Sequence, residues 1–307
     1  MIVYIGNGHY CYSNSAAMFL LSIGEHVSPQ MFEVLTGVGL GAMLENGKTL
    51  FLSMKDPDDG INCAFNILGI DADEHQQADC LEAPFSLLKK QMTRAPVLLG
   101  PLNMGELTYL PNHKHLNGAD HYVLGYAMDN QSIYLHDPAG FPYVPLTLEQ
   151  FKKAWKADDI PYCKGHFKYW SSPKKTHSLH DNEIYEKTIM YFKKTYQEFE
   201  NSNLELIGKD AILHYAQQLR YGPITHEMID HTTYFLFQLS AKRANDFAFF
   251  FKNKATNLSK LKIIQAETLG LCHYLSVNKE WSQLSEKLQT LADIEDRFRS
   301  ELFKTAI

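Results

Sequence analysis

The spacing of apolar residues changes at a point just beyond the middle of the chain. Before residue 172, short apolar runs of strand length alternate with helical patterns, and strands are predicted at 97–100, 121–126, 132–136 and 162–170. From residue 178 onward apolar residues recur at helical spacing, as in Tyr185, Ile189 and Phe192. We therefore expect an α+β domain over residues 1–172 and an all-α domain over 178–307, with Ser171–Lys175 as the boundary.

A predicted hairpin brings a histidine close to an aspartate. The strands at 121–126 and 132–136 are joined by a short turn at Asp129–Gln131, so they should pair antiparallel. His121 begins the first strand and Asp137 follows the end of the second. Because these two ends are neighbours in a hairpin, the pattern predicts an imidazole beside a carboxylate.

The other candidate residue is a cysteine at the start of a predicted helix. Tyr12, Ala16 and Phe19 have helical spacing, which puts Cys11 in the first turn. Unpaired N–H groups and the positive end of the helix dipole favour an anion there, so a thiolate at this place could act as a nucleophile. The alternative is that Cys11 is a small buried apolar residue, as most free cysteines are.

Cys11, His121 and Asp137 together have the composition of a thiol triad: nucleophile, base and orienting carboxylate. Each residue has a simpler explanation when it is taken alone. His121 could be a core histidine, and Asp137 before Pro138 is typical of a turn. Taken together, the three residues favour the triad, because their occurrence in this order and with this hairpin geometry would otherwise be a coincidence.

Composition and charge exclude several classes of function. The 307-residue chain has a formal charge of −6, which argues against nucleic-acid binding and against a membrane-surface protein. Five cysteines without CxxC spacing fit a reducing cytoplasm, and no apolar run is long enough to span a membrane. His113 and His115 have metal-ligand spacing but no partner nearby in sequence, so we expect no metal and no cofactor.

Five segments carry a resemblance to a known family. They resemble the butirosin biosynthesis protein H family, with its papain-like, C39-like N-terminal fold, over about the first 150 residues and more weakly along the helical tail. The resemblance implies that Cys11 is acylated by a carrier-protein thioester, that His121 is the base and that Asp137 orients it. It also implies a small-molecule amine acceptor and a role in secondary-metabolite biosynthesis. The segments are His9–Cys11, Thr36–Gly41, Ala95–Leu99, Tyr109–Pro111 and Gly118–Val123.

One position departs from the papain-like pattern. Papain-like enzymes have a glutamine oxyanion donor six residues before the cysteine, where this chain has Ile5, so Asn7 becomes the nearest side-chain amide. Losing such a donor slows amide cleavage by about 10²–10³. The sequence therefore favours a cysteine acyltransferase. A C39-like peptidase or amide hydrolase and a non-catalytic binding module remain as alternatives, with substrate-binding residues and oligomeric state undefined.

Overall fold

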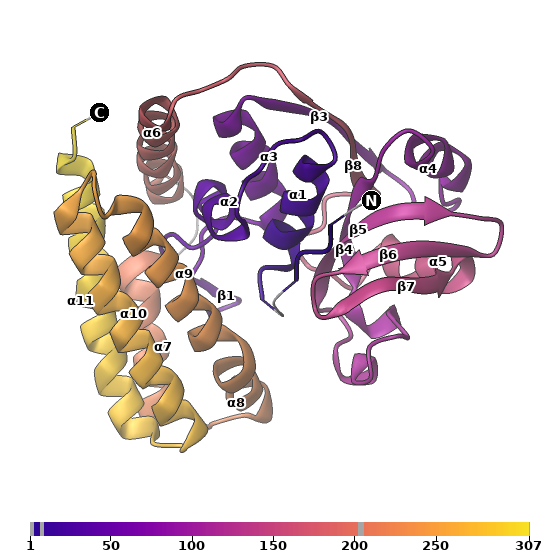
Figure 1. Ribbon diagram of the computed structural model, residues 1–307. Coiled ribbons are helices and arrows are strands. Elements are labelled where there is room, and N and C mark those ends of the chain that lie inside the picture. Colours follow the sequence, from indigo (N-terminus) through magenta and orange to yellow (C-terminus); the bar gives the residue numbers. More distant parts are fainter. Residues whose placement is uncertain (1–2, 7–8, 202–205, 307) are drawn as a thin grey trace. The chain divides into compact units, whose positions relative to one another are not determined.

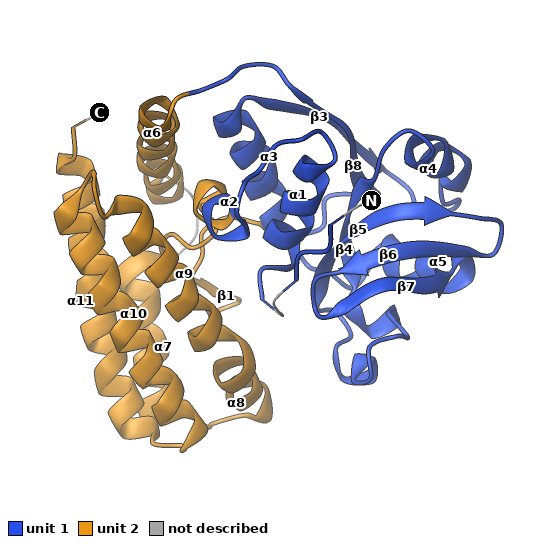
Figure 2. Ribbon diagram, viewed as in Figure 1, with its two compact units in different colours: residues 1–32, 57–179 blue, residues 33–56, 180–307 orange. Residues whose placement is uncertain are grey.

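The chain folds into two compact units in a computed structural model that describes residues 3–6, 9–201 and 206–306 (Figures 1 and 2). The sheet unit comprises Met1–Phe32 and Pro57–Leu179. The helical unit comprises Glu33–Asp56 and His180–Ile307. The α+β class followed by an all-α part is confirmed, although the segment 33–56 groups with the helical unit rather than with its neighbours in sequence.

A six-stranded antiparallel sheet forms the centre of the sheet unit, in the order β3-β8-β4-β5-β6-β7. The predicted hairpin is confirmed, because β5 and β6 pair antiparallel with Leu124 opposite His136. The strands are β3 (Ile70–Gln77), β4 (Val97–Asn103), β5 (Asp120–Met128), β6 (Ser132–Asp137), β7 (Phe141–Thr147) and β8 (His166–Lys175).

Successive residues of β5 contact helices on opposite faces of the sheet. Val123 belongs to an apolar cluster with Leu88 of α4 (Phe85–Met92) and Trp155 of α5 (Leu148–Lys156). Tyr122 instead packs on Tyr12 of α1 (Cys11–Leu21), with ring centroids 5.8 Å apart. Its hydroxyl also donates to Asp58 of α3 (Pro57–Leu68) at 2.5 Å. The sheet thus lies between two helical layers, with α1 and α3 side by side in Figure 1.

Two details of the predicted boundary differ in the structure. The strand expected at 162–170 lies further along the chain, as β8, and the boundary segment Ser171–Lys175 is part of it. Pro173 fits there because the pairing of β8 with β3 shifts register between the Asp73–Ser171 and Asp71–Lys174 pairs. A proline is tolerated at such an irregularity because no ladder hydrogen bond is required from it.

The helical unit is built around two apolar clusters. Leu44 and Leu50, from the hairpin of β1 (Met43–Glu45) and β2 (Thr49–Phe51), pack in one cluster with Tyr215. The helices are the C-terminal part of α2 (Pro29–Thr36), then α6 (Asp181–Glu200), α7 (Gly208–Tyr221), α8 (His226–His231), the π-helix η3 (Thr232–Leu236), α9 (Phe237–Phe251), α10 (Thr256–Val277) and α11 (Trp281–Lys304).

The segment 33–56 is tied to the helical unit by specific polar contacts as well as by apolar packing. Arg243 Nε donates to Glu33 Oε1 at 2.7 Å, and both side chains are buried. The Tyr191 hydroxyl donates to the Thr36 carbonyl at 2.8 Å. A buried ion pair holds a segment firmly, because removing either partner leaves an uncompensated charge.

A buried lysine links α3 to two strands of the sheet. Lys168 Nζ on β8 lies 2.6 Å from Asp58 Oδ2 and 3.1 Å from Glu74 Oε1 on β3. Burial would lower the pKa of Lys168, but the two carboxylates outweigh burial and raise it. The lysine therefore stays charged, and its loss would leave the buried Asp58 carboxylate without a cation.

We predict that Lys168→Met lowers the free energy of unfolding by about 3–5 kcal/mol, as breaking a buried pair does. The Asp58→Asn/Lys168→Met double variant should recover much of that loss because the buried Asp58 charge is removed together with its cation, while Glu74 is partly exposed. Urea unfolding followed by tryptophan fluorescence suits the test, since Trp155 and Trp170 both lie in the sheet unit. Lys153→Met, on an exposed pair with Glu149, is the control and should have little effect. Equal stabilities of Lys168→Met and the control would contradict the prediction.

Candidate active site

Cys11 is the first residue of α1, as the sequence predicts. The preceding Tyr10 is buried and has a left-handed backbone, with φ 63° and ψ 51°. This conformation is unfavourable for a bulky residue and needs support from its surroundings. The Asn14 side chain supplies it by donating to the carbonyls of His9 at 2.7 Å and Tyr10 at 2.9 Å. The cysteine is thus presented at a fixed position at the helix start.

The structure brings His121 and Asp137 to the side of Cys11. His121 Nε2 lies 2.7 Å from Asp137 Oδ1, and both side chains are buried. The Cys11 thiol hydrogen-bonds to the same ring. Because Nε2 faces the carboxylate, Nδ1 is the ring nitrogen that can exchange a proton with sulfur. Helix α1 is also fixed to β5 by Ser15 Oγ, which donates to the Tyr122 carbonyl at 3.0 Å.

The electrostatics of the site favour a protonated imidazole. Burial lowers the pKa of His121, but the charge and hydrogen bond of Asp137, with those of Cys11, raise it to about 10. A folded-state pKa above the ordinary 6.5 means that the protonated ring stabilises the fold. This contribution is complete below pH 6.5 and is lost as the pH rises through about 10.

Asp137 is surrounded by hydrogen-bond donors. Its Oδ1 also accepts from the Ala139 N–H at 2.7 Å, and its Oδ2 accepts from the Tyr109 hydroxyl at 2.8 Å. Burial would raise the pKa of Asp137, but the charge of His121 and these hydrogen bonds hold it below its ordinary value. The Tyr4 hydroxyl donates to the Asp137 carbonyl at 2.8 Å. The carboxylate is therefore ionised and fixed in position.

Two other cysteines lie in surroundings that suppress the thiolate. Burial raises the pKa of Cys272 to about 12. Burial is also the main cause of the raised pKa of Cys163. Cys11 differs from both because it is partly exposed and contacts a cationic ring. Of these three thiols, Cys11 has the surroundings that reactive cysteines need.

The remaining predicted site residues lie elsewhere or outside the described part. Asn7, the expected oxyanion donor, lies outside the described residues. Ile5, six residues before Cys11, is partly exposed. His113 lies in a short 3₁₀ helix (His113–His115), and its Nδ1 bonds to the Gly105 carbonyl at 2.7 Å.

The sequence did not reveal the contacts made by Tyr109, Tyr4 and Asn14. Tyr109 belongs to one of the segments that resemble a known family, but nothing in its local pattern connects it to Asp137, 28 positions away. Asn14 is one turn after Cys11, and an amide at that place could have been recognised as a cap for the entering loop.

Comparison with known proteins places the chain in a family. A family model described as the YobF C-terminal domain matches residues 202–303, within the helical unit. "Uncharacterized protein YobF" of Bacillus subtilis (strain 168) is 65% identical over 304 residues, which cover 99% of each chain. The chain therefore belongs to the YobF family.

A solved structure is similar to part of the chain. It is a proposed C39-like peptidase of Bacillus anthracis, 16% identical, with a TM-score of 0.40, covering 57% of this chain and 96% of its own. The matches do not support the resemblance to the butirosin biosynthesis protein H family.

In the part of the chain that is described, no helix is long and apolar enough to cross a membrane.

We predict that Tyr109→Phe lowers the free energy of unfolding by about 1.5–3 kcal/mol, because Asp137 loses a hydrogen bond to its charge. Guanidinium unfolding measures the change. The matched control is Tyr134→Phe, whose hydroxyl donates to the exposed Asp129 at 2.8 Å and should contribute nothing measurable. If the two variants are equally stable, Tyr109 does not support the carboxylate.

Proposed function

We propose that this protein is a cysteine-dependent acyltransferase, with Cys11 as nucleophile, His121 as acid and base, and Asp137 as the group that orients the ring. The observation that carries the proposal is the bond between His121 Nε2 and Asp137 Oδ1, 2.7 Å long, on a ring that also hydrogen-bonds to the thiol at a helix start. This arrangement supports covalent acyl chemistry at sulfur.

The proposed reaction has two steps. The Cys11 thiolate attacks the carbonyl carbon of a thioester, and the donor thiolate leaves with the proton of the His121 imidazolium. The amine acceptor then attacks the acyl-cysteine, gives its proton to His121, and Cys11 leaves as a thiolate. Cys11 is one of the groups that raise the pKa of His121. Acylation of the sulfur removes this contribution, so the imidazolium gives up its proton more readily when the donor thiolate leaves.

A thioester is the favoured substrate over an amide. Ile5 has no side-chain donor at the place where papain-like enzymes use glutamine, which leaves the backbone N–H groups at the start of α1 to bind the oxyanion. A thioester needs less stabilisation than an amide because its leaving group is a thiolate. A C39-like hydrolase that uses the same residues on peptides or amides is the second candidate.

The donor is proposed to be a carrier-protein or coenzyme-A thioester, and the acceptor a small-molecule amine. An acidic carrier protein would need a basic surface, and α5 offers the lysines Lys152, Lys153 and Lys156 for one. Their ammonium groups have other partners: Lys152 donates to the Leu81 carbonyl, Lys153 pairs with Glu149, and Lys156 pairs with Asp158. A small thioester is therefore the better first substrate to test.

We predict that acyl thioesters of coenzyme A or N-acetylcysteamine leave a single acyl group on Cys11, detected by intact and peptide mass spectrometry. His121→Ala should slow the acylation by about 10²–10⁴, the usual contribution of a general base. Cys163→Ser, at a thiol whose pKa is raised by burial, is the control and should acylate normally. Faster loss of the acyl group with added amine than in buffer supports a transferase, whereas equal rates favour the hydrolase. If no donor acylates a thiol that is still reactive, both are wrong.

A non-catalytic binding protein is the third candidate, and it predicts different thiol chemistry. For the enzyme, the rate at which iodoacetamide alkylates Cys11 should change as the pH rises through about 10, where the His121 ring loses its proton. Asp137→Asn removes the charge that raises the pKa of His121, so alkylation should become pH-dependent closer to neutrality. Identical pH profiles for the unmodified chain and for Asp137→Asn would favour the non-catalytic binding protein.

A further inference from the structure

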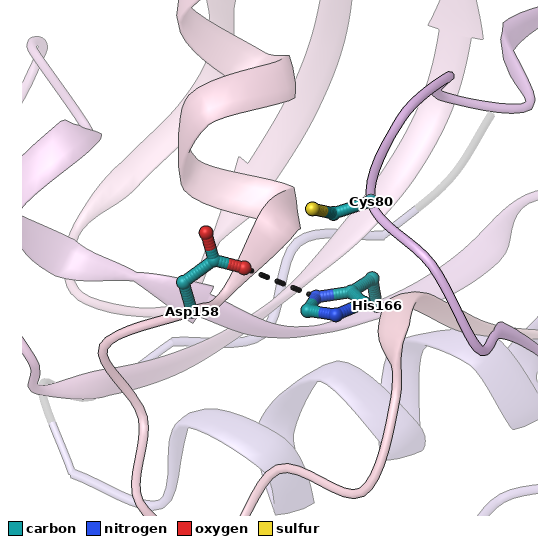
Figure 3. Close-up of side chains that lie close together, drawn as sticks. All are labelled: Cys80, Asp158 and His166. Atoms are coloured by element: carbon teal, nitrogen blue, oxygen red, sulfur yellow. Dashed lines mark ion pairs between the residues drawn. The ribbon is translucent and has the colours of Figure 1, made fainter.

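Three side chains capable of binding a metal converge at the end of the sheet where β8 begins (Figure 3). One ligand atom each of Cys80, Asp158 and His166 lies within 4.8 Å of the others. The fold explains the convergence. His166 is the first residue of β8 and pairs with Gln77, the last residue of β3, so the chain reaches Cys80 only three residues further on. Asp158 follows the end of α5, where Ala157 turns the chain with φ 55°.

We propose that Cys80, Asp158 and His166 bind a zinc ion, with water as the fourth ligand. A thiolate, an imidazole and a carboxylate form a donor set that suits zinc. Two ligands about 2.0–2.2 Å from a tetrahedral zinc lie about 3.4 Å apart. Asp158 Oδ1 and His166 Nδ1 are 3.1 Å apart, so an ion fits between them with little movement.

The cluster already attracts a positive charge. The Lys156 ammonium contacts the Asp158 carboxylate and also hydrogen-bonds to Cys80. Both partners are anionic ligands once the thiol has given its proton to solvent, so a divalent ion would be neutralised by them. The Lys156 side chain is 38% exposed, so the ion can displace its ammonium group into solvent.

The contacts of His166 are compatible with the replacement of the Lys156 ammonium group by a metal ion. Its Nδ1 bonds to the Lys156 carbonyl at 2.8 Å and faces Asp158. Binding an ion through Nδ1 replaces these contacts with a metal bond and leaves Nε2 to donate to water. Cys80 and His166 are partly buried while Asp158 is exposed, so an ion can enter from solvent. The ion would join the 78–84 segment, the end of α5 and the start of β8, which favours a stabilising role.

Cobalt absorption tests the site on the full-length chain, because a thiolate bound to Co²⁺ gives a strong near-ultraviolet charge-transfer band. The titration is done in Cys11→Ala, so that the thiol beside His121 does not contribute. We expect one Co²⁺ per chain, displaced by Zn²⁺. Cys80→Ser should abolish the band, and His166→Ala should weaken binding at least about tenfold. Lys156→Met should strengthen binding several-fold because it removes the competing cation.

Cys63→Ser is the matched control, since Cys63 is also partly exposed and lies on α3. It should leave the cobalt titration unchanged. A band that persists in Cys80→Ser, or the absence of one-to-one binding, would overturn the proposal, and so would loss of binding in Lys156→Met. Unchanged circular dichroism in each variant shows that the altered binding does not come from unfolding.

Discussion

The sheet unit depends on the way it accommodates one fully buried carboxylate. Removing an ion from water costs several kcal/mol unless its charge and lone pairs are satisfied. Asp137 meets this requirement with the His121 ring, the Ala139 N–H and the Tyr109 hydroxyl, while Tyr4 binds its carbonyl. These partners come from β5, the turn after β6, the loop after β4 and the N-terminal segment. Asp137 therefore holds four parts of the chain around His121, three through its carboxylate and one through its backbone carbonyl.

Much of the α+β unit could be predicted because its signals are local. The β5–β6 hairpin follows from two short apolar runs and a tight turn, and the start of α1 follows from helical spacing after Cys11. The two edge strands gave no such signal. β3 is mostly polar, and β7 contains Pro142 and Pro145. Edge positions permit both features because one side of the strand has no ladder partner, so the usual strand pattern is not required.

Within the proposed site, the residues that could be placed together from the sequence are those that the β5–β6 hairpin positions. His121 and Asp137 are 16 positions apart and meet because their strands pair, which the turn between them determines. Tyr109 reaches Asp137 through a long loop, and no periodic pattern determines where such a loop folds back. The grouping of 33–56 with the distant helices was equally hidden, because its contacts with Arg243 and Tyr191 span 155 positions or more.

The division of the chain into units has a consequence for how such a protein can be inherited. The polypeptide chain crosses from one unit to the other after residues 32, 56 and 179, so neither unit is encoded by one continuous stretch of gene. A recombination event that transferred the helical region alone would lose Leu44 and Leu50 from its core. The region before it would keep the segment 33–56, whose apolar side chains would have lost the helices that they pack on. Gene fusion and shuffling are therefore poor routes for separating the two units, and descent should keep them together.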